Sequence, residues 1–147
     1  MRMPGARVPP APGPIVKQPL KDRSILIVED DAVLSTDLAN LLTSHGCKVV
    51  LPTTSLASAS STIVHYLVDA AILDVNVQNE WVFPVAHALQ AAQIPFLFLT
   101  AYSHDSIPAE LRSRPFLQKP HVPQDLVDRL ASLLRPGEAV RRRQLVD

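Results

Sequence analysis

Several short apolar runs in this sequence are followed by side chains that can do chemistry. They are Glu29, Asp30 and Asp31 after the first run, Asp74 after a second, Thr100 after a third and Lys119 after a fourth. Carboxylates that converge on one crevice repel one another and raise one another's pKa unless a cation lies among them. Oxygen ligands favour Mg²⁺, which bridges carboxylates to a phosphoryl oxygen, while an ammonium and a hydroxyl can bind the remaining oxygens. The residue types therefore indicate magnesium-dependent phosphoryl chemistry, provided that the fold brings them together.

The first apolar run and the residues after it have the pattern of a strand followed by a helix. Residues 25–28 are continuously apolar and rich in β-branched side chains, as in a parallel strand that is buried on both faces. Apolar residues then recur at helical spacing from Val33 to Leu42. The Asp30-Asp31 pair is a candidate N-cap, and Gly46 lies just beyond the end of the pattern. We predict one β-α unit here.

The same alternation continues to about residue 135. Further strands are predicted at residues 47–51, 70–73, 96–99 and 116–118, and further helices at 55–67, 82–92, 106–111 and 123–134. Five such units in residues 24–135 predict an α/β fold: a doubly wound, five-stranded parallel sheet with helices on both faces. Ligands of such sheets bind beyond the carboxyl ends of the strands, where the residues above lie. No strand is followed by a glycine-rich phosphate loop, so the sequence does not favour nucleotide binding.

The formal net charge of zero hides an uneven distribution of charge. Residues 1–23 carry a net charge of +4 and six of the 14 prolines, residues 24–135 carry −5, and residues 136–147 carry +1. We predict a Pro-rich, basic, disordered tail over residues 1–22, one folded domain over 23–135 and a basic C-terminal tail over 136–147. An acidic domain argues against nucleic acid as the main partner, because Lys and Arg supply the affinity for phosphates.

The sequence also argues against membrane and cysteine-based classes of protein. No apolar run approaches the roughly 20 residues of a membrane helix, and prolines between residues 4 and 14 break any signal-peptide core. Cys47 is the only cysteine, which excludes an internal disulfide and a cysteine-based zinc site. We expect a cytoplasmic protein without a membrane partner.

Four segments of the chain together resemble the signature of bacterial response-regulator receiver domains, which belong to two-component signalling. The segments are ILIVEDD at residues 25–31, Leu73-Asp74, Thr100-Ala101 and Lys119-Pro120. The resemblance spans residues 24–135 and implies a flavodoxin-like (βα)5 domain with strand order 2-1-3-4-5. Lys119 lies only 19 positions after Thr100, and prolines lie at 108 and 115, so we expect a short or irregular fourth helix.

The resemblance implies a role for each candidate site residue. Asp74 would be the phosphoacceptor, and Thr100 and Lys119 would bind the phosphoryl group. The Mg²⁺ ligands would be Asp30, Asp31, Asp74 and the backbone carbonyl of Asn76, with Glu29 in the same acidic pocket. Asp30 and Asp31 are also candidates for the helix cap, and one role does not exclude the other.

Three residues are candidates for reporting phosphorylation to the surface. Thr100 would bind the arriving phosphoryl group. Phe116 lies three positions before Lys119, where many receivers carry the aromatic residue that turns inward on phosphorylation, and Tyr102 is a competing candidate. Residues 98–103 also resemble the Phe-Ala-Thr-Gly-x-Tyr motif of a subgroup of stand-alone receivers, with differences at Leu99, Ala101 and Ser103.

These inferences predict a single-domain response regulator and not an enzyme. A histidine kinase or a histidine phosphotransfer protein would donate to Asp74, and phosphorylation would switch protein contacts or drain phosphate from a shared kinase. The region of the fourth helix and fifth strand is a candidate surface for a homodimer. Two alternatives stay open. One is a binding module that is never phosphorylated, suggested by the altered fourth helix and the loop at residues 76–81. The other is a small Mg²⁺-dependent phosphohydrolase, which would need a second acid where the chain has Asn76.

Overall fold

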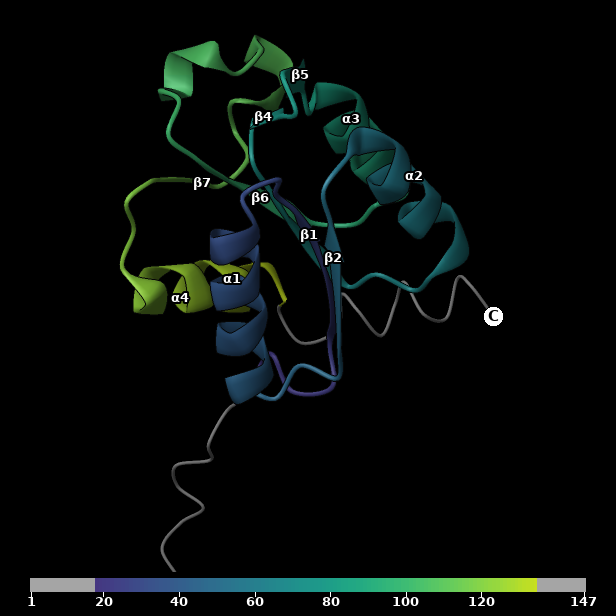
Figure 1. Ribbon diagram of the computed structural model, residues 1–147, viewed down its shortest axis with the longest axis vertical. Coiled ribbons are helices and arrows are strands. Elements are labelled where there is room, and N and C mark those ends of the chain that lie inside the picture. The colour runs from purple at the N-terminus through teal and green to yellow at the C-terminus, as the bar shows by residue number, and fades with distance from the viewer. Residues whose placement is uncertain (1–17, 135–147) are drawn as a thin grey trace, which may run out of the picture.

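The computed structural model describes residues 18–134, which form a parallel sheet with helices on both faces (Figure 1). The strands of this sheet are β1 (Ser24–Val28), β2 (Val49–Thr53), β3 (Ala70–Leu73), β6 (Phe96–Thr100) and β7 (Phe116–Gln118). Their order across the sheet is β2-β1-β3-β6-β7, and all neighbouring pairs are parallel. This is the predicted order 2-1-3-4-5, and the flavodoxin-like fold is confirmed.

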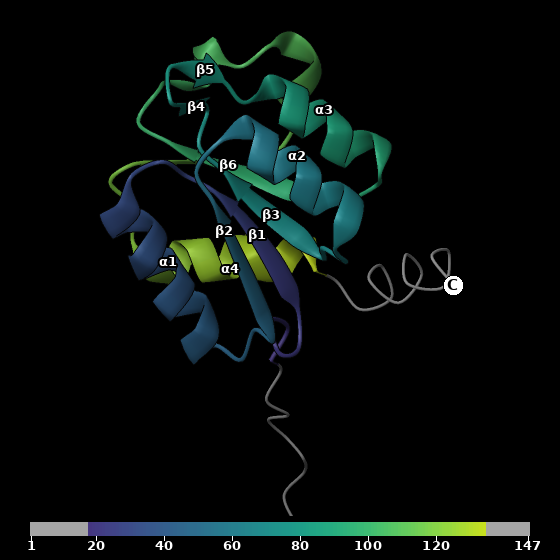
Figure 2. The same ribbon diagram turned by 45° about the vertical axis from the view of Figure 1, so that its right-hand side comes forward.

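Two pairs of helices cover the sheet (Figure 2). α1 (Ala32–Ser44) and α4 (Pro123–Leu133) lie on one face, and α2 (Leu56–His65) and α3 (Phe83–Ala91) lie on the other. Successive strand residues point to opposite faces. Ile25 therefore packs in the cluster that contains Leu38 and Leu126, whereas Leu26 packs in the cluster that contains Leu89. No helix within residues 18–134 is long and apolar enough to cross a lipid bilayer.

β2 begins and ends two residues later than predicted, because it continues through Pro52. Within the described residues, β2 lies at an edge of the sheet and pairs only with β1. The carbonyl of Thr53 accepts from the N–H of Glu29 (3.0 Å). Backbone groups of successive strand residues face opposite sides, so the main chain of Pro52 faces away from β1, where a missing N–H costs no ladder hydrogen bond.

Two 3₁₀ turns, η2 (His104–Ser106) and η3 (Ala109–Leu111), stand where the fourth helix was predicted. Ile107 and Leu111 anchor this segment with buried side chains. Arg112 Nε donates to the carbonyl of Ile107 (2.8 Å), which closes the segment on itself. The expectation of a short or irregular fourth helix is confirmed.

The folded region begins earlier than predicted. Leu20, which the sequence placed in the N-terminal tail, is 1% exposed and packs in the core under α1 and α4. The N–H of Asp22 donates to the carbonyl of Gly46 (2.8 Å), which ties this segment to the end of α1. Residues 18–22 are therefore part of the domain. The rest of the two predicted tails, residues 1–17 and 135–147, lies outside the described residues.

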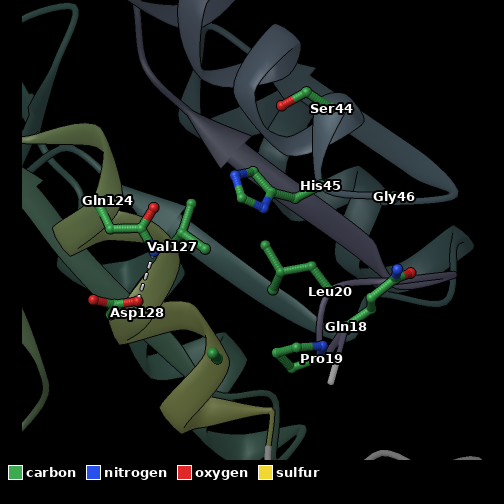
Figure 3. A pocket seen from close by; sticks show the side chains of 10 residues that line it. Gln18, Pro19, Leu20, Ser44, His45, Gly46, Gln124, Val127 and Asp128 are labelled. Carbon is green, nitrogen blue, oxygen red and sulfur yellow. Dashed lines mark hydrogen bonds between the residues drawn. The ribbon is translucent and has the colours of Figure 1, made fainter. Parts of the chain in front are cut away.

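A cavity of about 440 Å³ opens beside this segment, between the end of α1 and α4 (Figure 3). Leu20 and Val127 contribute apolar lining, and His45 and Asp128 contribute polar lining. Because α1 runs back from the carboxyl edge of the sheet, the cavity lies at the opposite edge from the strand ends that carry the candidate site residues. None of those residues lines it.

Candidate functional site

The ends of β1 and β3 bring two acidic residues side by side. β1 and β3 are neighbours in register, with Val28 opposite Leu73, and the next residues along the chain are Glu29 and Asp74. The N–H of Asp74 donates to the carbonyl of Val28 (2.9 Å), which continues the ladder into the site. The parallel pairing of two buried strands therefore fixes the spacing of these two carboxylates.

Asp30 joins them to form a group of three carboxylates. One oxygen from each of Glu29, Asp30 and Asp74 lies within 4.8 Å of the other two. Glu29 is 2% exposed and Asp74 is 9% exposed, whereas Asp30 faces solvent. The lysine predicted at this edge also reaches the group. Lys119 Nζ lies 2.9 Å from Glu29 Oε1 and 3.0 Å from Asp74 Oδ2. The structure thus brings Glu29, Asp30, Asp74 and Lys119 together from three strand ends.

The electrostatics of the group favour a divalent cation. Burial raises the pKa of the Glu29 carboxyl, against hydrogen bonds from Lys119 and the Asp31 N–H that lower it. Burial would lower the pKa of Lys119, but its hydrogen bonds to Glu29 and Asp74 prevail and raise the pKa. With all four groups ionised, three carboxylates and one ammonium leave a net charge of −2. Hard oxygen donors with that charge fit Mg²⁺.

Asp31, which the sequence also suggested as a ligand, lies outside this group of three carboxylates. Its Oδ1 accepts from the N–H groups of Val33 (3.0 Å) and Leu34 (3.1 Å), so it is the N-cap of α1. Its own N–H donates to Glu29 Oε2 (3.0 Å). Of three consecutive acids, the first two face the site, and the third turns back to cap the helix because the chain changes from strand to helix at this point.

The remaining predicted residues lie around the group. Thr100, at the end of β6, is fully buried, and its Oγ1 accepts from the N–H of Tyr102 (3.2 Å). The N–H of Lys119 donates to the carbonyl of Thr100 (2.8 Å), so β6 and β7 hold these two residues at the same edge. Asn76 lies two residues beyond Asp74 and is half-buried.

The two aromatic candidates for a switch differ in their surroundings. Phe116, on β7, is half-buried, and its ring meets His104 edge-on with a centroid distance of 5.2 Å. Tyr102 is 43% exposed and contacts Trp81. Phe116 thus packs against the 3₁₀ segment, whereas Tyr102 lies at the surface next to Thr100.

A small hairpin beside the site was not predicted from the sequence. β4 (Asn76–Val77) and β5 (Glu80–Trp81) pair antiparallel, and the turn residues Gln78 and Asn79 have φ of 53° and 65°. Positive φ at both positions is typical of a type I′ turn, which usually carries Asn-Gly or Asp-Gly, and the sequence Gln-Asn gave a weaker signal. The N–H of Gln78 donates to Asp30 Oδ2 (2.6 Å), so the hairpin holds an acidic side chain of the site.

The response regulator receiver domain family matches residues 25–131 of the chain. This span covers most of the chain, which therefore belongs to the response regulator receiver family. Receivers are signalling domains of two-component systems and not a class of enzyme; they interact with histidine kinases or phosphotransfer proteins, and Mg²⁺ binding is typical of them.

Solved structures agree with this assignment. The solution structure of SdrG from Sphingomonas melonis Fr1 is 39% identical, has a TM-score of 0.66, and covers 77% of this chain and 97% of that chain. The BeF3-activated conformation of SdrG from Pseudomonas melonis Fr1 is 37% identical, with a TM-score of 0.66, and covers 78% of this chain and 98% of that chain. A CheY-like receiver domain protein from Methanospirillum hungatei JF-1 is 20% identical, with a TM-score of 0.68 and coverage of 76% and 93%, and shares the fold. No curated protein is significantly similar to the chain.

Proposed function

We propose that the chain is a response regulator in which Asp74 accepts a phosphoryl group from a histidine kinase or a histidine phosphotransfer protein. One observation carries the proposal. The Lys119 ammonium holds Asp74 Oδ2 at 3.0 Å, within a group of three carboxylates at the carboxyl edge of the sheet. A carboxylate that is oriented by an ammonium and faces a cation site suits nucleophilic attack on a phosphoryl group.

Transfer of the phosphoryl group from a phosphohistidine to Asp74 needs no further reactant. A carboxylate oxygen of Asp74 attacks the phosphorus of a phosphohistidine, the P–N bond breaks, and an acyl phosphate forms. The leaving imidazole keeps the electron pair and takes up a proton. Lys119 then binds a phosphoryl oxygen, and the Thr100 hydroxyl, two strands away from β1 at the same edge, donates to another.

Mg²⁺ fits the donor set. Asp30 and Asp74 would hold the ion, with Glu29 close by and the backbone carbonyl of Asn76 as a further ligand. The ion supplies positive charge that stabilises the phosphoryl oxygens during transfer. The same residues would hold Mg²⁺ before any phosphoryl group arrives, so the affinity for the metal can be measured separately from phosphorylation.

Phosphorylation would then alter the surface around Thr100. The added group carries a charge of about −1.5 to −2 and new acceptor oxygens, which draw Thr100 inward and change the packing of Phe116 or Tyr102. The altered surface switches protein contacts, or the acyl phosphate acts as a sink. Pairing of two copies through η2, η3 and β7 is part of the same proposal.

Intact-protein mass spectrometry after incubation with acetyl phosphate and Mg²⁺ tests the proposal. We expect the mass of one phosphoryl group on most molecules, and no adduct when a chelator removes the metal. If no adduct forms with any small phosphodonor and Mg²⁺ binding is also undetectable, the chain is instead a binding module that is not phosphorylated. Steady turnover of a phosphate monoester would instead favour the phosphohydrolase.

A pair of substitutions tests which acids bind the metal. Asp30→Asn is expected to weaken Mg²⁺ binding roughly tenfold or more, since even groups that only support a metal ligand have effects of about 10- to 100-fold. Asp31→Asn is the matched control, because Asn caps helices as well as Asp does, and its Mg²⁺ affinity should stay within about twofold of the original. Isothermal titration calorimetry measures both. Equal losses in the two variants would contradict the ligand set drawn here and restore Asp31 to it.

A further inference from the structure

A row of aromatic rings runs from the core under α3 to the surface beside the site. Phe96 and Phe98 on β6 meet at 5.5 Å between ring centroids, and Phe98 meets Phe83 at 6.4 Å. Trp81 stacks on Phe83 at 5.7 Å with an interplanar angle of 7°, and meets Tyr102 edge-on at 5.4 Å. Phe98 is buried, whereas Trp81 and Tyr102 are 47% and 43% exposed. The Trp81–Tyr102 contact is thus the outermost contact of the row, and stacking on Phe83 holds Trp81 in place.

Each ring of this outermost contact belongs to a loop that reaches the site. Trp81 lies opposite Asn76 in the hairpin whose turn residue, Gln78, donates its N–H to Asp30. The N–H of Val82 donates to the carbonyl of Val75 (2.8 Å), which fixes the base of the hairpin directly after Asp74. On the other side, the N–H of Tyr102 donates to Thr100 Oγ1. The contact between Trp81 and Tyr102 therefore joins the hairpin that binds Asp30 to the loop after β6 that binds the Thr100 hydroxyl.

The hydrogen bond from Tyr102 bears on what Thr100 must do. If the Thr100 hydroxyl turns to a phosphoryl oxygen on Asp74, Oγ1 moves toward β3, which is the neighbour of β6 in the sheet. Either the 3.2 Å contact with the Tyr102 N–H then breaks, or Tyr102 follows Thr100. In the first case Thr100 loses this hydrogen bond, and in the second the edge-on contact between Tyr102 and Trp81 changes, because Trp81 stays stacked on the partly buried ring of Phe83.

We propose that Trp81 is a positioning residue that holds Tyr102, and through it the Thr100 hydroxyl, in the arrangement of the unphosphorylated protein. The inference rests on the proposed function and adds a restraint that the receiver signature does not include. Trp81 thereby opposes activation, and the strength of its contact with Tyr102 sets how readily the protein takes the phosphorylated form. An aromatic pair of this kind shifts such an equilibrium roughly two- to tenfold.

Titration with beryllofluoride, a non-covalent mimic of the phosphoryl group, at saturating Mg²⁺ measures this shift by calorimetry. Trp81→Leu and Tyr102→Leu are each expected to bind beryllofluoride roughly two- to tenfold more tightly than the original chain. The double variant should bind no more tightly than either single variant, because both remove the same contact. Trp81→Phe, which keeps a ring, should bind like the original chain. So should Tyr66→Leu, which removes a 60% exposed tyrosine just after α2.

A second measurement does not depend on replacing the tryptophan. Trp81 is the only tryptophan, so the tryptophan fluorescence comes from this residue alone and is sensitive to its contacts. We expect beryllofluoride to change the emission of the original chain, and we expect Tyr102→Leu to show the changed emission before any addition.

The outcomes separate the two proposals. If the original chain binds no beryllofluoride, the phosphoacceptor function fails and the restraint fails with it. If the original chain binds it but Trp81→Leu and Tyr102→Leu bind with unchanged or lower affinity, only the restraint is overturned. Effects of the two substitutions that add in the double variant would also overturn it, because they would then act separately.

Discussion

Asp74→Asn is expected to abolish the uptake of a phosphoryl group from acetyl phosphate, from near-complete modification to none. An amide is not a nucleophile toward phosphorus, and neither of the other two carboxylates of the site can replace Asp74 as the nucleophile. Glu29 is almost fully buried, and Asp30 lies on the solvent side with one oxygen bound to the Gln78 N–H. Intact-protein mass spectrometry gives the stoichiometry directly.

The loss should not come from unfolding. Asn has the shape of Asp, and Lys119 keeps its 2.9 Å hydrogen bond to Glu29. Removal of one of three neighbouring carboxylates also relieves repulsion. Urea unfolding of Asp74→Asn should therefore give a free energy no lower than that of the original chain. Asp37→Asn, an exposed acid on α1, is the matched control and should be phosphorylated normally. A phosphoryl adduct that persists in Asp74→Asn would place the acceptor elsewhere in the chain.

Leu20→Ala is expected to lower the free energy of unfolding by about 2–5 kcal/mol, the usual cost of such a truncation in a packed core. Leu20 is 1% exposed and packs in the cluster with Ile25, Leu38 and Leu130. Leu20 also lines the cavity between α1 and α4. The space left by the truncated side chain would join this cavity, and no neighbouring side chain on that side would fill it. Urea unfolding followed by circular dichroism measures the change.

Leu67→Ala is the matched control for this experiment. Leu67 is 38% exposed and follows the end of α2, so its truncation removes few contacts and should cost well under half as much. If Leu20→Ala costs no more than Leu67→Ala, then residues 18–22 do not stabilise the domain, and its boundary returns to residue 23.

The sequence predicted the sheet well because its inner strands are buried on both faces. β1 and β6 are buried at every position, so they appear as continuous apolar runs with clear ends. Once the strands are parallel, their carboxyl ends share one edge, which is why the sequence alone predicts Glu29, Asp74, Thr100 and Lys119 at the same edge. The pattern was weaker at β2, because an edge strand tolerates Pro52 where an inner strand would not.

The sequence was least informative where a choice depends on local backbone direction. The acids at 29, 30 and 31 are chemically alike, and only the exit of the chain from strand into helix decides that Glu29 and Asp30 face the site while Asp31 caps α1. The hairpin was missed because its strands have two residues each and its turn lacks glycine. Leu20 was missed because the prolines and positive charges around it are typical of a tail, although a single leucine there packs into the core.

The proline in β2 also bears on how copies of this domain can associate. A sheet edge with free N–H and C=O groups can accept a strand from another molecule and so lead to aggregation. On the β2 edge, Pro52 offers no N–H to such a strand, and on the other edge β7 has only three residues. Both edges of the sheet are thus poor templates for a further strand. Contacts with other proteins therefore do not need to extend the sheet, and they can use side chains of the helices, the loops and β7.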